Sequence, residues 1–245
     1  SIGKLFISGI LPGILLAALF MLVIYIQARL NPSLAPPGPR FSWHERFSSL
    51  KGILPILVLF VFVIGGLYAG IFTPTEAGAV GAFVAFLIIL LKRKFSKEGL
   101  ITALKDTMQA TGMIFVILIG AMVFNYFIVV SGLSTELANF MTAIGASKYL
   151  VLTFVVVILL VLGAIMDEPP MILLTMPILF PVVTAVGFDP IWFGVISTLL
   201  CEAGLILPPV GMNVFIVAGV TDVPVFTVYR GIIPFFVAIL VCIAI

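Results

Sequence analysis

Residues 203–215, AGLILPPVGMNVF, interrupt an apolar stretch at 191–220 that is long enough to span a bilayer. Pro208 and Pro209 supply no backbone N–H donors and their rings clash with carbonyls one turn earlier, while Gly211 adopts dihedral angles that other residues resist. A helix must therefore open here and leave N–H and C=O groups without intrahelical partners. Hydrocarbon cannot satisfy such groups, so the break must lie inside protein or beside a water-filled cavity. Secondary transporters build ion sites from broken helices of this kind, and we expect one here.

Two carboxylates, Asp167 and Glu168, lie between two short apolar runs at 149–166 and 171–187. If the runs form a re-entrant hairpin, its tip carries charge inside the membrane, where ionisable groups serve function, as ligands of a hard cation or in a proton relay. In the alternative interpretation the runs are two short full spans joined by a water-exposed loop. Glu202, one turn before the break, either holds the two half-helices by accepting hydrogen bonds from freed N–H groups or contacts an ion directly.

The segment GIFTPTEAGAVGAF at 70–83 joins two apolar runs. Thr75 can cap the following helix, and Glu76 lies in its first turn, where a negative charge suits the helix N-terminus. Pro74, which follows Thr73, is typical of the first helical position. The segment is thus interpreted as a helix-starting turn, with ion binding or anchoring of a moving domain as the alternative.

Composition restricts the class of protein. Of 245 residues, 63% are hydrophobic and 9% are charged, and the mean hydropathy is +1.38. A soluble domain of this size cannot hide so much apolar surface, so the chain is predicted to be an all-α polytopic membrane protein. Cys201 and Cys242 lie in apolar runs and are expected to be buried thiols. His44 lies in a basic loop and Asp167 has no intramembrane Asp partner at helical spacing, so no protease constellation can be assembled and an enzyme is not expected.

The spans follow from the apolar runs, because about 20 residues cross a bilayer as a helix. The hairpin at 149–187 is expected to be re-entrant because its two runs are too short for full spans. Two segments, 41–51 and 96–107, are amphipathic and are expected to lie at the membrane interface, the second with Ser96 as its N-cap. The remaining runs are at 5–28, 52–71, 76–91 and 112–130, followed by the broken span at 191–220 and a last span from about 231.

Basic residues predict the orientation, because Lys and Arg are enriched in cytoplasmic loops. Two loops, 29–51 and 92–105, hold nine of the twelve Lys and Arg residues and are expected in the cytoplasm. Residues 131–148 and the C-terminal Ile245 then lie outside. The nine basic residues are Arg29, Arg40, Arg46, Lys51, Lys92, Arg93, Lys94, Lys97 and Lys105.

An internal similarity indicates repeats. The opening KLFISGILPGILLAALF resembles the closing PVFTVYRGIIPFFVAIL, so that Gly9–Pro12 corresponds to Gly231–Pro234. If this similarity reflects inverted repeats, the common plan of such transporters, residue 1 lies near the end of a first repeat. We then expect 1–28 to end the first repeat, 29–111 to form scaffold spans with interfacial arm helices, and 112–245 to form half of a transport domain.

Three strings, GIFTPTEAGAV, MDEPPMILLTMPILFPVVTAVGFDPIWFGVI and GLILPPVGMNVF, resemble the large membrane (M) subunit of tripartite ATP-independent periplasmic (TRAP) transporters. The opening SIGKLFISGILPG is similar to the junction between the two halves of that subunit. The resemblance implies the C-terminal half of an elevator-type transporter in the bacterial inner membrane. Its implied partners are the lipid bilayer, the N-terminal half of the same subunit, a small membrane (Q) subunit and a periplasmic protein that delivers an organic acid. A sodium gradient drives uptake in this family, and no other cofactor and no nucleic acid is implied.

The resemblance also implies a second-half sodium site at the hairpin tip and the break. Leu207 departs from the family pattern, which usually has Thr there, and Leu200 departs from a frequent Asn. Because the Thr hydroxyl is missing, we expect backbone carbonyls to supply most of the ligands. The implied sodium-binding residues are Asp167, Glu168, Pro169, Gly204, Ile206, Leu207, Pro208, Pro209, Val210 and Gly211, with Thr73, Thr75, Glu76, Glu202 and Asn213 in support.

Two other functions stay open at this point. A divalent-anion:sodium symporter would work without a binding protein. An ion channel would need continuous polar faces along several helices, which this chain lacks. The substrate cannot be identified, because the only basic residues outside the two cytoplasmic loops are Lys4, Lys148 and Arg230.

Overall fold

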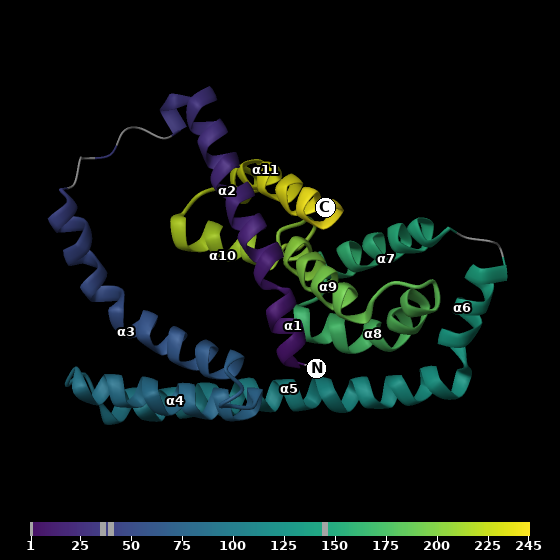
Figure 1. The fold of residues 1–245 in the computed structure, drawn as a ribbon, viewed down its shortest axis with the longest axis horizontal. Coiled ribbons are helices and arrows are strands. Elements are labelled where there is room, and N and C mark those ends of the chain that lie inside the picture. The colour runs from purple at the N-terminus through teal and green to yellow at the C-terminus, as the bar shows by residue number, and fades with distance from the viewer. Residues whose placement is uncertain (1, 35–37, 39–41, 144–146) are drawn as a thin grey trace. The chain divides into compact units, whose positions relative to one another are not determined.

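A computed structural model describes residues 2–34, 38, 42–143 and 147–245, and all of its regular elements in these ranges are helices (Figure 1). Arg40, Phe41 and residues 144–146, which belong to predicted loops, lie outside the described residues. The elements are α1 (Ile2–Ser8), α2 (Ile10–Leu30), η1 (Pro32–Leu34), α3 (Trp43–Tyr68), α4 (Pro74–Leu91), α5 (Lys97–Ser131), α6 (Leu133–Ala143), α7 (Lys148–Gly163), α8 (Glu168–Ala185), α9 (Pro190–Gly204), α10 (Met212–Thr221) and α11 (Val225–Ala244).

Five helical segments in the described part of the chain are long and apolar enough to cross a membrane, or six if the bent α3 is one span. They are Ile2–Leu30, α4, α5, α8 and α11. The expectation that both runs of the hairpin at 149–187 are too short for full spans therefore holds for α7, which has 16 residues, and is wrong for α8. Large apolar side chains on these segments are exposed, as at Leu11, Phe83 and Val129. Such a surface is compatible with lipid and not with water, so the predicted all-helical, multi-pass architecture is confirmed.

The chain forms two compact units, one of residues 1–7 and 27–109 and the other of residues 8–26 and 110–245. Each unit has its own packing and is described separately below. Whether these units act as scaffold and transport domain stays a prediction.

In the unit of residues 27–109, α3 packs against α4. Ser42 caps α3 in a capping box with Glu45, whose carboxylate accepts the Ser42 N–H at 2.7 Å. The helix bends by 54° between Leu50 and Gly52. The amphipathic segment therefore continues directly into the following span, and the bend separates the two parts.

The predicted separation of 96–107 from the span at 112–130 is wrong. Residues Lys97–Ser131 form one continuous helix of 35 residues, about 52 Å long at 1.5 Å per residue. The sequence contains no proline in this range, and Gly112 alone does not stop a helix whose neighbours are good helix formers. Ser96 does lie at the expected start, since its hydroxyl accepts the Gly99 N–H at 2.9 Å.

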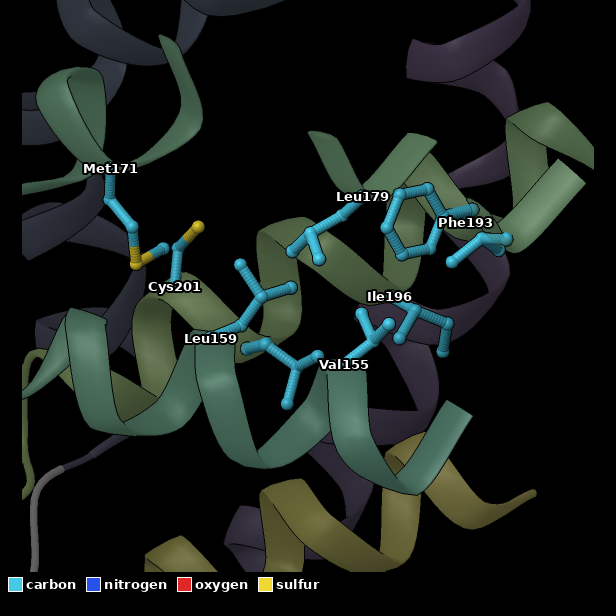
Figure 2. Packing of buried hydrophobic residues seen from close by; sticks show 9 residues of the cluster. Val155, Leu159, Met171, Leu179, Phe193, Ile196 and Cys201 are labelled. Carbon is cyan, nitrogen blue, oxygen red and sulfur yellow. The ribbon is translucent and has the colours of Figure 1, made fainter. Parts of the chain in front are cut away.

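In the unit of residues 8–26 and 110–245, α7, α8 and α9 enclose a common apolar core. Leu159 from α7, Met171 from α8 and Leu200 from α9 are fully buried there. In Figure 2, Leu159 of α7, Leu179 of α8 and Ile196 of α9 point toward one another. This core fixes the hairpin of α7 and α8 against the helix that leads into the break.

Residues 133–143, predicted outside the membrane, form α6, which packs against α8. The Ser134 hydroxyl donates a hydrogen bond to the Pro177 carbonyl at 3.0 Å, because a proline at position 181 leaves that carbonyl without its usual helical donor. Ser134 is thus partly buried, whereas Thr135 beside it is exposed.

We expect Thr135→Cys to react with a membrane-impermeant maleimide added to intact spheroplasts, because the basic-residue count puts 131–148 outside. Ser134→Cys, next to it but bonded to α8, is expected to react several times more slowly. Mass spectrometry of the labelled protein measures both. Labelling of Thr135→Cys only after the membrane is permeabilised would reverse the topology.

Candidate ion-binding site

The chain leaves the helix after Gly204 and re-enters one at Met212. The segment between them holds the two prolines, whose mutual peptide bond is cis, and ends at Gly211. Gly211 has φ 46° and ψ 68°, in the left-handed region that favours glycine. The break thus lies where the Pro-Pro-Val-Gly sequence predicts it.

The hairpin tip supplies the acceptor for the N–H groups that the break sets free. The Ala164 carbonyl, directly after α7, accepts the Val210 N–H at 3.2 Å and approaches the Gly211 N–H at 3.5 Å. A third bond closes the break on itself, from the Asn213 N–H to the Leu205 carbonyl at 3.2 Å. The tip and the two half-helices are therefore joined through backbone groups.

Three carbonyls of the break remain open. Among the described residues, the carbonyl oxygens of Ile206, Leu207 and Pro208 accept no hydrogen bond. The carbonyl oxygens of the next two residues, Pro209 and Val210, do have a donor. The Tyr229 hydroxyl of α11 lies 3.4 Å from the Pro209 oxygen and 3.1 Å from the Val210 oxygen. Open carbonyls at an unwound helix are the ligands that transporters offer to sodium.

Two glycines let the tip approach the break. A Cβ built on Gly204 would lie 2.6 Å from the Cα atom and 2.7 Å from the carbonyl carbon of Gly163. Both positions are buried, and Met171 of α8 lies next to them. Only a glycine fits at Gly204 while the backbones of α7 and α9 stay at this distance.

The two carboxylates of the hairpin tip, Asp167 and Glu168, differ in their surroundings. Asp167 is the N-cap of α8, and its Oδ1 accepts the Glu168 N–H at 3.0 Å. Asp167 and Pro169 are exposed, and Glu168 is partly buried. In the described part of the chain, no group of three or more His, Cys, Asp or Glu side chains could hold a metal ion.

Glu202 does not join the two half-helices by hydrogen bonds, which was one of the two roles predicted for it. In the described residues it accepts no hydrogen bond from the break, whose N–H groups bind Ala164 instead. Its side chain lines a cavity of about 380 Å³, otherwise walled by apolar residues of α2, the break and α11, including Phe20, Ile206 and Phe235. Glu202 itself is exposed, so its carboxylate borders this space beside the break and is not buried in it.

The supporting residues Thr73, Thr75 and Glu76 belong to the other compact unit. Thr73, not Thr75, caps α4: its hydroxyl accepts the Glu76 N–H at 3.3 Å, and Glu76 accepts the Thr73 N–H at 2.8 Å. The prediction that Thr75 caps is wrong, because Pro74 takes the first helical position and the capping box requires Glu at the third position after the capping Thr. The interpretation of the segment as a helix start is confirmed.

We expect Glu76→Gln to keep most of the transport activity, because an amide oxygen can still accept the Thr73 N–H. Uptake by the reconstituted transporter, at matched protein levels, measures this. Glu76→Ala, which removes the acceptor, is the comparison and should lower thermal stability more. Loss of sodium dependence in a well-expressed Glu76→Gln protein would put the carboxylate in an ion site.

Three features of this site were not predicted from the sequence. Ala164 contributes only its backbone carbonyl, and Tyr229 contributes a hydroxyl from a helix distant in sequence. Gly163 matters through the absence of a side chain. The small pair Gly163-Ala164 at the end of an apolar run was the only signal that could have indicated a close approach of backbones.

Comparison with known proteins identifies the family. The family model described as "Tripartite ATP-independent periplasmic transporter, DctM component" matches residues 1–245. The chain is 37% identical over 242 residues to the C4-dicarboxylate TRAP transporter large permease protein DctM of Pseudomonas aeruginosa, covering 98% of this chain and 56% of that protein. It is 34% identical over 245 residues to the sialic acid TRAP transporter large permease protein SiaM of Vibrio cholerae, covering 100% of this chain and 57% of that protein.

A third relative is the 2,3-diketo-L-gulonate TRAP transporter large permease protein YiaN of Escherichia coli, 34% identical over 237 residues that cover 96% of this chain and 55% of that protein. The chain belongs to the DctM family of TRAP transporter permease components. This confirms the family resemblance, and a permease of this family is a transporter component and not an enzyme. The chain spans about half the length of the curated relatives it matches.

Proposed function

We propose that the chain is the C-terminal half of a large permease subunit and that the complete transporter takes up an organic acid with a sodium gradient. In this proposal a periplasmic binding protein delivers the acid, and the Q subunit and the N-terminal half of the large subunit complete the assembly in the bacterial inner membrane. The names of the relatives support the substrate class, because C4-dicarboxylate, sialic acid and diketogulonate are all carboxylic acids.

The second-half sodium site is assigned to the open carbonyls of the break, with the hairpin tip as its closing element. The observation that carries this assignment is the pair of contacts from the Val210 and Gly211 N–H groups to the Ala164 carbonyl. They hold the tip at the break, so that opening the tip also disturbs the backbone at Leu207. The remaining implied residues, from Asp167 to Pro169 and from Gly204 to Asn213, shape these two elements.

The elevator mechanism and the inverted repeats belong to the same proposal. Residues 29–111 act as the scaffold, and 112–245, with the re-entrant hairpin and the broken helix, act as half of the moving domain. Open carbonyls at a helix break, rather than a cage of carboxylates, support a site that binds and releases a monovalent ion during this movement.

Uptake of a radiolabelled C4-dicarboxylate or sialic acid by the complete transporter in proteoliposomes tests the proposal. We expect uptake with an inward sodium gradient and a loaded binding protein, and none with choline in place of sodium. Uptake that needs sodium but no binding protein would favour the divalent-anion:sodium symporter, and a current without coupled substrate would favour a channel.

Two variants test the site through the sodium dependence of uptake. Leu207→Thr is expected to preserve or lower the half-saturating sodium concentration, because it adds a hydroxyl that the family pattern favours. Asp167→Asn is expected to change it little, because an amide oxygen can still cap α8 at Glu168. A clearly raised half-saturating concentration in Asp167→Asn would make the carboxylate a sodium ligand, and a rise in Leu207→Thr would argue against the site at the break.

A further inference from the structure

A groove runs between α4 and the first turns of α5, within the unit of residues 27–109. Its volume is about 420 Å³, within the range of small-molecule sites. Ala82, Phe86 and Ile89 form one wall and Gly99, Ala103 and Leu104 the other. The small side chains on both helices leave the space, which no described residue fills. We call this space the α4–α5 groove.

A tight turn closes one end of the groove and sets a cation at its mouth. Arg93 adopts a left-handed conformation with φ 53°, and the Lys94 N–H donates to the Ile89 carbonyl at 3.1 Å. Phe95 then packs edge-on against Phe86, with ring centroids 5.9 Å apart. Lys94 lines the groove at this end and its side chain is exposed.

The polar groups inside the groove already have partners. The Thr107 hydroxyl donates to the Ala103 carbonyl at 2.7 Å, and the Ser96 hydroxyl accepts the Gly99 N–H at 2.9 Å. Among the described lining residues, the Lys94 ammonium is the charged group that can meet a ligand. The turn carries further positive charge at Lys92, Arg93 and Lys97, against the single acid Glu98.

An apolar slot with a cluster of cations at one end fits an amphiphile with a negative head. We propose that the α4–α5 groove binds an anionic phospholipid, with one acyl chain along the groove and the phosphate at Lys94. Basic pockets between membrane helices bind such head groups.

The groove is long enough for part of an acyl chain. From Ala82 to Ile89 its wall is about 10 Å long at 1.5 Å per residue. The first part of an acyl chain can therefore lie in the groove while the phosphate meets the cations at its mouth. This match of an apolar slot to a positive mouth favours an anionic lipid over a wholly apolar partner.

Tryptophan quenching by brominated lipids tests the proposal on the complete transporter in nanodiscs. Phe86→Trp puts a reporter in the groove wall, and the unmodified protein gives the baseline for its own Trp43 and Trp192. We expect half-maximal quenching at a mole fraction of brominated phosphatidylglycerol about fivefold lower than that of brominated phosphatidylcholine, which corresponds to one charge near the surface. Phe83→Trp, exposed on the same helix but outside the groove, is the matched control and should respond equally to both lipids.

Charge variants decide whether the cation at the mouth selects the lipid. Lys94→Gln in the Phe86→Trp protein should abolish the preference for phosphatidylglycerol. Lys105→Gln, an equal change of charge outside the groove lining, should preserve it. Equal quenching of Phe86→Trp by both lipids would overturn the proposal. Absence of quenching by either lipid would also overturn it, since a protein segment would then cover the groove.

Discussion

Gly204→Ala is expected to abolish sodium-driven uptake and to lower the thermal stability of the complete transporter. The added methyl group would lie 2.6 Å from the Gly163 Cα atom, a distance that real Cβ atoms do not adopt. No side-chain rotation relieves this contact, because a Cβ atom is fixed by its own backbone and the Gly163 atoms that it meets are backbone atoms. The helices α7 and α9 must separate, which opens the core around Leu200 and moves Ala164 away from the break. Overpacking of this kind costs on the order of 2 kcal/mol or more.

Gly219→Ala on α10 is the matched control, because a Cβ at Gly219 meets nothing within 4 Å. It should retain wild-type uptake and unfolding temperature. Gly163→Ala should lie between the two, since its Cβ would be 3.0 Å from the Gly204 Cα atom. Unfolding temperatures in detergent and initial uptake rates measure all three. If Gly204→Ala behaves like Gly219→Ala, the close approach of α7 and α9 is not required.

Gly211→Val should abolish uptake while a folded protein is still produced. A β-branched residue is strained at φ 46°, with a cost of about 1–2 kcal/mol for the left-handed conformation of an L-residue. Its Cβ would also lie 2.7 Å from the Leu207 carbonyl oxygen. Relief of this contact must move one of the three open carbonyls, so the site itself is altered.

Gly187→Val separates strain from the effect on the site. Gly187 also has a positive φ, 91°, but a Cβ there meets nothing within 4 Å. It should lower stability without changing the half-saturating sodium concentration of uptake. Gly211→Ala, with less bulk, should keep residual uptake at a raised sodium concentration. Equal sodium dependence in Gly211→Ala and the wild type would show that the Leu207 carbonyl is not a ligand.

Much of the fold follows from sequence, because its determinants are local. Apolar length predicts the spans, and the two prolines with Gly211 predict where the apolar stretch at 191–220 opens. The errors have local causes too. Without a proline between 97 and 131, helix propensity joins an amphipathic segment to a span, and the spacing of a capping box selects Thr73 over Thr75.

The site was predictable only in outline. Charge drew attention to Asp167 and Glu202, yet Asp167 caps α8 as Asp189 caps α9. The groups that join tip and break are an alanine carbonyl and backbone N–H groups, which every residue has and no sequence pattern marks. Tyr229 is brought to the break by tertiary packing of α11, which one-dimensional patterns do not contain.

Hydrogen exchange with and without sodium tests the central claim, that sodium binds where the hairpin tip meets the break. The complete transporter is compared in sodium and in potassium at equal ionic strength, and peptides that cover 160–168 and 203–213 are followed by mass spectrometry. An ion held by the break stabilises the closed junction, so exchange at Val210 and Gly211 should slow in sodium. Peptides of α4 should exchange equally in both. Equal exchange of the 203–213 peptide in sodium and potassium, at a sodium concentration that saturates uptake, would contradict the account.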